Sequence, residues 1–265
     1  MSRQVIQSAN IYFSPTGTTR KIVRSISAGL ALRPREIDLT LPTARQNQQF
    51  ALEKEELLVA AFPVYGGRLP KLAQEIFQNL PAGRRPAVAV VVYGNRAYED
   101  ALLELFDLCI KKGCYLVGAG AFIGEHSYSH VMGRNRPDPA DEEAARCFGL
   151  SIRHSLLGSD RVLSEKTLLA NARRPYRKYS AKLEITPDTS RKCVSCQICV
   201  KNCPAGAFIN GDPRKIDQDK CILCAACIKM CPEKAKSFND DDFTDDMAAL
   251  AAANLDRKEP VTFLP

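Results

Sequence analysis

The stretch CVSCQICVKNCP at residues 193–204 decides how this chain is organised, because it recurs as CILCAACIKMCP at residues 221–232. Each copy has the spacing C-x2-C-x2-C-x3-C-P, and the second follows the first at an offset of 28 residues. The chain has 11 cysteines, and all but Cys109, Cys114 and Cys147 lie in these two copies. Clustered cysteines without an apolar signal core at the start of the chain indicate metal or redox chemistry rather than disulfides. The pattern predicts an internal duplication of one metal-binding unit.

This spacing favours two [4Fe–4S] clusters. Thiolates at i, i+3 and i+6 of a looping backbone can converge on one cluster, whereas the proline turns the chain away after the fourth cysteine. In two-cluster ferredoxins that fourth cysteine ligates the other cluster. We therefore assign one cluster to Cys193, Cys196, Cys199 and Cys231, and the other to Cys203, Cys221, Cys224 and Cys227. Zinc sites are the alternative, but they use two ligand pairs with a longer gap.

Upstream of the cysteines, apolar runs alternate with amphipathic stretches. The near-continuous apolar runs predict strands buried on both faces of a sheet, at residues 6–13, 35–39, 57–62, 87–93 and 115–123. Apolar residues at helical spacing predict helices between them, as at Leu72, Ile76 and Leu80. This alternation predicts a doubly wound parallel sheet, in which ligands bind at the loops after the strands.

Three of these loops carry residues suited to a phosphorylated ring compound. Hydroxyl groups and a glycine before a helix can cradle a phosphate, although an ordinary capped helix start is the alternative. The residues of this loop are Ser14, Thr16, Gly17, Thr18 and Thr19. Glycines and tyrosines after the third and fourth strands can enclose a flat ring. The residues there are Pro63, Val64, Tyr65, Gly66, Gly67, Arg68, Tyr93, Gly94, Asn95, Arg96 and Tyr98.

The run Ser-Pro-Thr-Gly-Thr-Thr at residues 14–19 matches the flavodoxin phosphate loop [ST]-x-T-G-x-T, and residues 4–157 resemble flavodoxin. Residues 188–238 resemble bacterial two-cluster ferredoxins. The whole chain is similar to the EFR-type flavodoxin–ferredoxin fusion family. This resemblance implies FMN and two [4Fe–4S] clusters in one polypeptide. The chain departs from flavodoxins in having no tryptophan to lie beside the flavin, and in offering Arg68 and Arg96 where flavodoxins have acidic surroundings.

The expected fold is an α/β flavodoxin-like doubly wound parallel sheet with a small α+β ferredoxin-like domain. We expect an FMN-binding domain at residues 1–157, a linker at 158–187, a two-cluster domain at 188–238 and a tail with a helix at 239–265. The basic stretch at 173–182 is expected to be solvated.

The expected function is electron transfer between FMN, the clusters and redox-protein partners such as ferredoxins. An FMN-dependent reductase of a small molecule, with the clusters as a relay, is the alternative, and a redox sensor is a third class. His126 follows the fifth strand and could donate to the flavin or shuttle a proton, but an ordinary loop histidine is the other interpretation.

Net charge and hydropathy bear on two further classes of protein, those that bind nucleic acids and those that span a membrane. The formal charge of +7 falls to roughly +3 once two clusters of about −2 each are counted, so we expect no nucleic-acid partner. No apolar run approaches the roughly 18 residues that a membrane span requires. We therefore expect a cytoplasmic protein without a membrane span.

Overall fold

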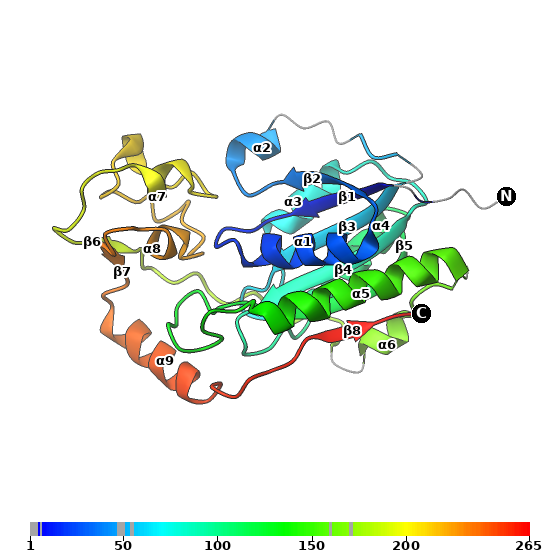
Figure 1. Cartoon of the computed structure of the whole chain (residues 1–265). Helices are drawn as coiled ribbons and strands as arrows, with labels where there is room; N and C mark the ends of the chain where they lie inside the picture. The colour runs from blue at the N-terminus through cyan, green and yellow to red at the C-terminus, as the bar shows by residue number, and fades with distance from the viewer. Residues whose placement is uncertain (1–4, 6, 47–50, 54–55, 159–160, 170–171) are drawn as a thin grey trace.

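The computed structural model describes residues 5, 7–46, 51–53, 56–158, 161–169 and 172–265, so residues 1–4 and Ile6 of the first predicted strand lie outside the described residues. A helix-covered sheet forms the larger part, and a cysteine-rich domain lies beyond one end of it (Figure 1). The strands of the main sheet are β1 (Gln7–Tyr12), β2 (Arg33–Asp38), β3 (Glu56–Pro63), β4 (Pro86–Tyr93), β5 (Tyr115–Ile123) and β8 (Val261–Phe263). The helices of this part are α1 (Thr18–Leu30), α2 (Pro42–Gln46), α3 (Leu72–Asn79), α4 (Ala101–Lys111), α5 (Pro139–Gly158) and α6 (Glu165–Leu169).

The sheet has the order β2-β1-β3-β4-β5-β8, in which the first five strands are parallel. The chain reverses its direction of winding at β1, which pairs with both β2 and β3. This order is the flavodoxin-like variant of the doubly wound fold, and its ligands bind at the carboxyl ends of the strands beside the reversal. The predicted fold class is confirmed by this topology.

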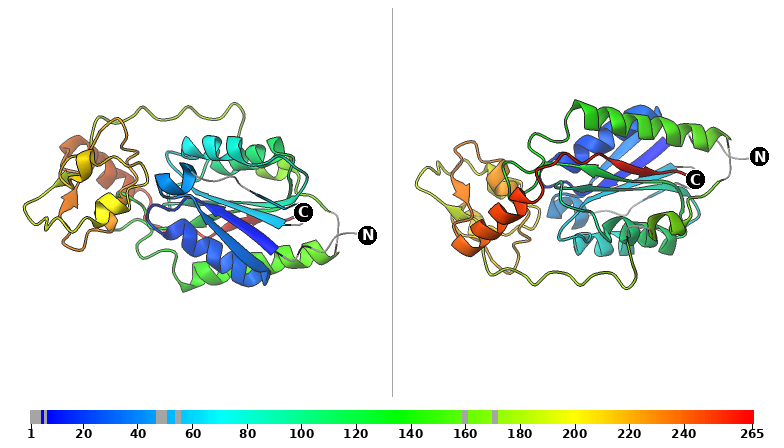
Figure 2. Two further views of the ribbon diagram at one scale, coloured as in Figure 1. Left: turned by 90° about the horizontal axis from the view of Figure 1, so that it is seen from above. Right: turned by 90° about the horizontal axis from the view of Figure 1, so that it is seen from below.

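Both faces of the sheet are covered by helices (Figure 2). Along β3, Val59 packs into the apolar layer formed with α1 and α5, whereas the next residue, Ala60, packs into the layer formed with α3 and α4. Helices α1 and α5 approach closely because Gly29 and Gly149 face each other's helix, and a Cβ at either position would collide with a backbone oxygen. The near-continuous apolar strands are therefore explained by burial on both sides.

The cysteine-rich domain repeats one unit. Its helices are α7 (Ile198–Lys201) and α8 (Ala226–Lys229), its short antiparallel ribbon is formed by β6 (Asp188–Thr189) and β7 (Lys236–Ser237), and a 3₁₀ turn, η1 (Ile209–Gly211), joins the halves. The two helices keep the sequence offset of the two motifs. This domain faces the carboxyl ends of the parallel strands (Figure 1).

The segment that follows the cysteines returns to the main sheet. Helix α9 (Asp241–Ala252) is capped by Asp240, whose side chain accepts a hydrogen bond from the amide of Phe243 at 2.8 Å. The chain then runs back along the larger domain and ends in β8, which pairs antiparallel with β5 (Figures 1 and 2). The helix was predicted, whereas β8 was not.

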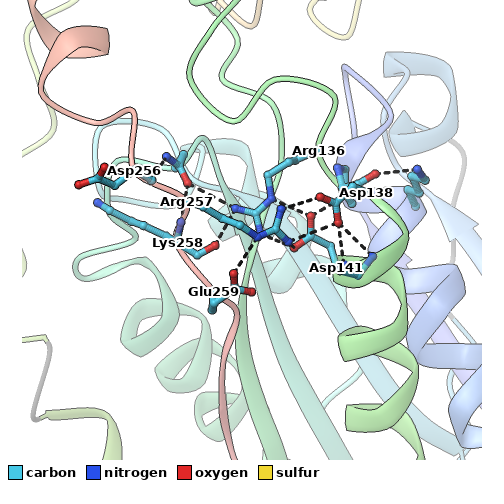
Figure 3. A network of polar contacts seen from close by, with 11 residues as sticks. Arg136, Asp138, Asp141, Asp256, Arg257, Lys258 and Glu259 are labelled. Carbon is cyan, nitrogen blue, oxygen red and sulfur yellow. Dashed lines mark hydrogen bonds and ion pairs between the residues drawn. The ribbon is translucent and has the colours of Figure 1, made fainter.

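A polar network fixes this returning segment (Figure 3). Arg136 and Asp141 form a buried ion pair, and Arg136 Nη1 also donates to the carbonyl of Lys258 at 2.6 Å. Arg257 pairs with Asp138 at 2.6 Å. The segment is thus tied to the start of α5 as well as to the sheet.

The connection between the two domains is anchored to the larger domain, although most of its side chains are exposed. The carboxylate of Asp100 accepts hydrogen bonds from the backbone amides of Arg173, at 3.1 Å, and Arg177, at 2.7 Å. The Asp107 carboxylate pairs with Arg174 and accepts a hydrogen bond from Tyr176. Most side chains of residues 173–182 are exposed, while acidic residues at the start and on the surface of α4 hold the segment against the larger domain.

Across the ranges that the structure describes, no helix is both long and apolar enough to cross a membrane.

Candidate functional site

A cleft opens at the carboxyl ends of the parallel strands. Its walls come from four loops, which follow β1, β3, β4 and β5. The lining residues that the sequence had predicted are Thr16, Thr18, Thr19, Pro63, Val64, Tyr65, Gly66, Gly67, Tyr93, Gly94, Arg96 and His126. The topology thus brings together residues that are more than 100 positions apart in the sequence.

The loop after β1 forms a tight turn into α1. Gly17 has φ +85°, a left-handed conformation that favours glycine, and its amide donates to the carbonyl of Ser14 at 3.1 Å. The Ser14 hydroxyl accepts from the amide of Arg20 at 3.0 Å. The first-turn amides of a helix have no intrahelical acceptor, so they are free to bind an anion.

Thr19 provides a second sign of an anion at this position. Its side chain is 1 % exposed, and its hydroxyl has no hydrogen-bond partner within the described part of the chain. A buried hydroxyl without a partner costs free energy. A ligand oxygen in the cleft would satisfy it.

Five of the predicted cofactor residues do not line the cleft, and one of them, Gly17, lines a neighbouring hollow with Thr16 and Lys21. Ser14 caps the turn into α1, and Tyr98 packs against the ring of Tyr93 with centroids 5.6 Å apart. Asn95 turns outward to the C-terminal segment. Arg68 is buried in a bidentate ion pair with Glu104 at 2.9 Å. These side chains support the loops from behind.

Arg68 holds the connecting segment in place. Its guanidinium lies 4.2 Å from the ring centroid of Tyr179 and 4.9 Å from that of Tyr176, and it donates to the carbonyl of Arg177. The ion pair with Glu104 raises the pKa of Arg68 above its ordinary value. Arg68 is therefore a structural residue, and its expected role beside the flavin is not supported by its geometry.

Arg96 lies on the cleft wall, and its charge is partly balanced. Its Nη1 donates to Glu99 at 2.6 Å, and Glu99 also pairs with Arg177. Burial lowers the pKa of Arg96, although an arginine stays cationic at neutral pH. The cleft therefore carries one positive group with a carboxylate directly behind it.

His126 lies on the wall opposite Gly94, where any Cβ would collide with the imidazole. Burial lowers the pKa of His126 to about 4, and the charges of Lys229 and Arg96 act in the same direction. Its Nδ1 accepts a hydrogen bond from the amide of Tyr128 at 3.2 Å. At neutral pH the ring is uncharged, so its proton lies on Nε2, which is left to donate.

The first set of cysteines surrounds a hollow in the small domain. Cys193, Cys196 and Cys199 line it from the first motif, and Cys231 reaches it from the second. Cys196 is exposed, so this hollow opens to solvent. These four residues, from both motifs, therefore line one hollow.

The second set of cysteines, Cys203, Cys221, Cys224 and Cys227, includes no exposed residue. Burial raises the pKa of Cys224 to about 12, and charge on Cys227, Cys203 and Cys221 would raise it further. Burial also raises the pKa of Cys227 to about 12, with Cys203 again among its neighbours. Cys203 of the first motif is therefore close enough to Cys224 and Cys227 to influence their pKa values. Such thiols lose their protons only when a cation binds.

The two halves repeat their backbone geometry. Ser195 and Gln197 have positive φ angles of 55° and 66°, and the matching Leu223 and Ala225 have 54° and 58°. Outside these loops, the amides of Ala207 and Ala235 each donate to the sulfur four residues earlier, at 3.3 Å. Non-glycine residues rarely adopt positive φ, so the duplicated loops are held in a specific shape.

The second cysteine loop lies directly against the cleft. Tyr128, on the cleft wall, donates from its hydroxyl to the carbonyl of Leu223, the residue before Cys224. Lys229 of α8 pairs with Glu125 of the same wall. Burial raises the pKa of Tyr65 well above its ordinary value, and the neighbouring Cys224 adds to this effect. One side of the cleft is therefore closed by the small domain.

The sequence prediction missed several lining residues. They are Pro15, Val92, Ala97, Gly124, Glu125, Ser127 and Tyr128. Most flank the predicted loop residues and could have been included by extending each loop. Tyr128 is different, because its role depends on the position of the small domain, which the sequence does not contain.

Comparisons with known proteins found matches for two parts of the chain. Residues 192–236 match the 4Fe-4S dicluster domain family. Among curated proteins no match was found.

Solved structures resemble the N-terminal part. One is a flavodoxin from the domain Archaea, with 12% identity and a TM-score of 0.40, covering 57% of this chain and 99% of that chain. Flavodoxin 1 from Bacillus cereus has 16% identity and a TM-score of 0.42, covering 55% and 96%. The rubredoxin oxygen:oxidoreductase from Desulfovibrio gigas has 12% identity and a TM-score of 0.39, and the match covers 59% of this chain but only 38% of that one.

The chain combines a flavodoxin-like sheet, defined by its strand order, with a 4Fe-4S dicluster domain. This is the arrangement predicted for a flavodoxin–ferredoxin fusion.

Proposed function

We propose that this chain is an electron-transfer flavo-iron–sulfur protein, with FMN in the cleft and two [4Fe–4S] clusters on the eight motif cysteines. One observation carries the proposal: the hydroxyl of Tyr128 on the cleft wall donates to the carbonyl of Leu223, next to Cys224. A group held in the cleft and a cluster held by Cys224 would be neighbours across this contact.

The cleft fits FMN by the chemistry of its donors. The free amides at the start of α1 and the unpartnered Thr19 hydroxyl suit the phosphate. Tyr65 and Tyr93 offer aromatic surfaces to a flat ring. Gly67 and Gly94 allow the side chains of Glu99 and His126 to pack directly against the loop backbone. We assign the phosphate to Thr16, Gly17, Thr18 and Thr19 on this basis.

The cysteines fit two clusters by their number and their crossing. The hollow lined by Cys193, Cys196, Cys199 and Cys231 supports the first set, and the shared surroundings of Cys203, Cys221, Cys224 and Cys227 support the second. The division into an FMN-binding domain at residues 1–157, a connection at 158–187 and a cluster domain at 188–238 follows from these assignments. Thiols in such sites stay reduced in the cytoplasm, where we place the protein.

A flavin exchanges one or two electrons and each cluster exchanges one, so together they convert between electron pairs and single electrons. This chain contributes by holding the sites together, since joining the two domains gives a high effective concentration for their encounter. Tyr128 and Leu223 fix the approach of the domains, while Tyr65 and His126 exclude water from the cleft wall.

The exposure of the cysteines indicates the order in which electrons would pass through the two clusters. Cys224 is 8% exposed and lies against the cleft, whereas Cys196 in the first set is exposed. We therefore place the first set on the outside, where a redox protein of the ferredoxin type can meet it, and the second set between it and the flavin.

The decisive experiment begins with the purified chain, which should contain FMN and roughly eight iron atoms. The order is then tested with Cys196→Ser and Cys224→Ser, each expected to impair one cluster in EPR spectra. Both variants should slow flavin reduction by a reduced ferredoxin in stopped flow. A chain that binds no flavin, or a Cys224→Ser variant that reduces its flavin at the native rate, would contradict the proposal.

A reductase of a small molecule is the second candidate. The observation in its favour is that the cleft wall carries Arg96, His126 and Ser127, which are polar groups beside the expected ring. The two candidates differ in their acceptor, because reduced protein would be reoxidised by a small molecule in one case and only by proteins in the other.

A further inference from the structure

The internal repeat places a lysine where its counterpart is apolar. Lys236 follows Cys231 by five residues, as Phe208 follows Cys203, so the two positions are equivalent in the duplicated unit. In the structure they meet, with Nζ of Lys236 lying 5.0 Å from the ring centroid of Phe208. At this position the two halves therefore differ by one positive charge inside the domain.

Lys236 is buried and its hydrogen-bond partners are neutral. The residue is 4 % exposed, and Nζ donates to the hydroxyl of Thr189 and the carbonyl of Pro213, both at 2.7 Å. Among the described residues, no ion pair includes Lys236. Taking an ammonium out of water is costly unless an opposite charge lies nearby.

Beside the exposed Glu233, which lines the same hollow, the cysteine thiolates of a bound cluster are the negative groups near Lys236. Lys236 lines the hollow of the first cysteine set. Its charge also lowers the pKa of Cys199 and of Cys227, against the larger opposing effect of burial, so it acts on both sets. A cluster held by four thiolates carries about −2, and one more negative charge after reduction.

We propose that Lys236 is the internal counter-charge of the iron–sulfur domain, and that it raises the reduction potentials of the clusters on both cysteine sets. The inference rests on the proposed function, because it requires the clusters to be present. A fixed cation stabilises the reduced cluster more than the oxidised one, since the reduced form has the larger negative charge. Low dielectric strengthens this effect, and burial prevents solvent from screening it.

The test is an EPR-monitored redox titration of the full-length, cluster-loaded protein. Lys236→Met removes the charge, and Lys236→Gln removes the charge but keeps an N–H donor for Thr189 and Pro213. We expect both variants to lower the reduced-to-oxidised ratio at a fixed potential by about tenfold or more, which corresponds to about 59 mV for a one-electron couple. Lys236→Arg should stay close to the native potential.

Two control variants separate the effect of the Lys236 charge on the potentials from the effect of its hydrogen bonds on the fold. Thr189→Val removes one acceptor and keeps the ammonium, so it should lower the unfolding temperature and leave the potentials unchanged. Lys215→Met removes an exposed charge of the same domain and should shift them far less.

The outcomes distinguish the two proposals. Native protein without iron or cluster signals overturns the proposed function and this inference together. Native clusters with unchanged potentials in Lys236→Gln overturn only the role of Lys236, and this variant decides the question if Lys236→Met fails to load iron.

Discussion

The side-chain amide of Asn95 donates one hydrogen bond to the carbonyl of Asn254 and another to that of Asp256, each at 2.9 Å. Asn95 follows Gly94 of the cleft wall, and its Oδ1 accepts from the amide of Lys258 at 3.3 Å. The C-terminal segment in Figure 3 therefore braces a cleft loop from the outside.

Asn95→Asp tests this brace. The variant keeps the Oδ1 acceptor and tolerates the positive φ of 60°, but it removes both N–H donors. Two carbonyls then lose their partners, so the free energy of unfolding should fall by about 1–3 kcal/mol. FMN binding should weaken with it. Urea unfolding and FMN titration measure the two effects, and Asn239→Asp, an exposed amide, is the matched control. Unchanged stability in Asn95→Asp would mean that the brace contributes nothing.

Sequence periodicity predicted the parallel sheet because its strands are buried on both faces. Val59 and Ala60 are both apolar although they face opposite layers, and such runs identify a central strand without knowledge of its neighbours. Strand β8 has only three residues, Val261–Phe263, and its stability comes from pairing with β5. A run that short has no periodicity to detect.

The sequence predicted which loops form the candidate site, but it did not predict the directions in which their side chains point. Arg68 and Arg96 both follow a strand end, yet Arg68 turns away to Glu104 while Arg96 stays on the cleft wall. Loop position alone cannot distinguish them, because the difference depends on a carboxylate of α4. The cysteine spacing was more informative, since ligand geometry is contained in the motif itself.

Thr19→Val tests the phosphate cradle with an isosteric change. The Thr19 hydroxyl has no partner in the described part of the protein, so its loss should not lower the stability of the apoprotein. Its loss should weaken FMN binding by about 1.5–3 kcal/mol, or about 10- to 150-fold, because a charged acceptor loses a donor. Riboflavin lacks the phosphate and should bind both proteins equally. A matched loss for riboflavin would place the phosphate elsewhere.

Arg96 and Glu99 should shift the midpoint potential of bound FMN in opposite directions. Reduction adds negative charge to the flavin, so Arg96→Gln should lower the potential. Glu99→Gln should raise it, because it leaves the Arg96 charge unbalanced. A change of about 59 mV in a one-electron potential corresponds to about 1.4 kcal/mol, a plausible size for one partly exposed charge. Spectroelectrochemical titration measures both variants, and shifts of the same sign would argue against a charge effect.

His126 should make the fold sensitive to acid. Burial lowers its pKa from 6.5 to about 4, so the unfolded chain binds a proton at a higher pH than the folded one does. The stabilisation is fully present above pH 6.5 and is lost as the pH falls towards 4, by up to about 3 kcal/mol. Urea unfolding at several pH values would show this slope. His126→Gln should lack it over that window, and an equal slope in the variant would assign it to other groups.

The last prediction separates carrier from enzyme. No dinucleotide fingerprint is present in the sequence, and the cleft is closed on one side by the cysteine loop that Tyr128 contacts. We therefore expect NADH and NADPH to reduce the flavin slowly and a reduced ferredoxin to reduce it fast in anaerobic stopped flow. Cys196→Ser should slow only the ferredoxin reaction, because electrons from that donor must pass the outer set. The matched control is Cys147→Ser, which changes an exposed cysteine outside both motifs. Fast reduction by a nicotinamide, with the same rate in Cys196→Ser, would instead identify the larger domain as a flavin reductase whose electrons leave through the clusters.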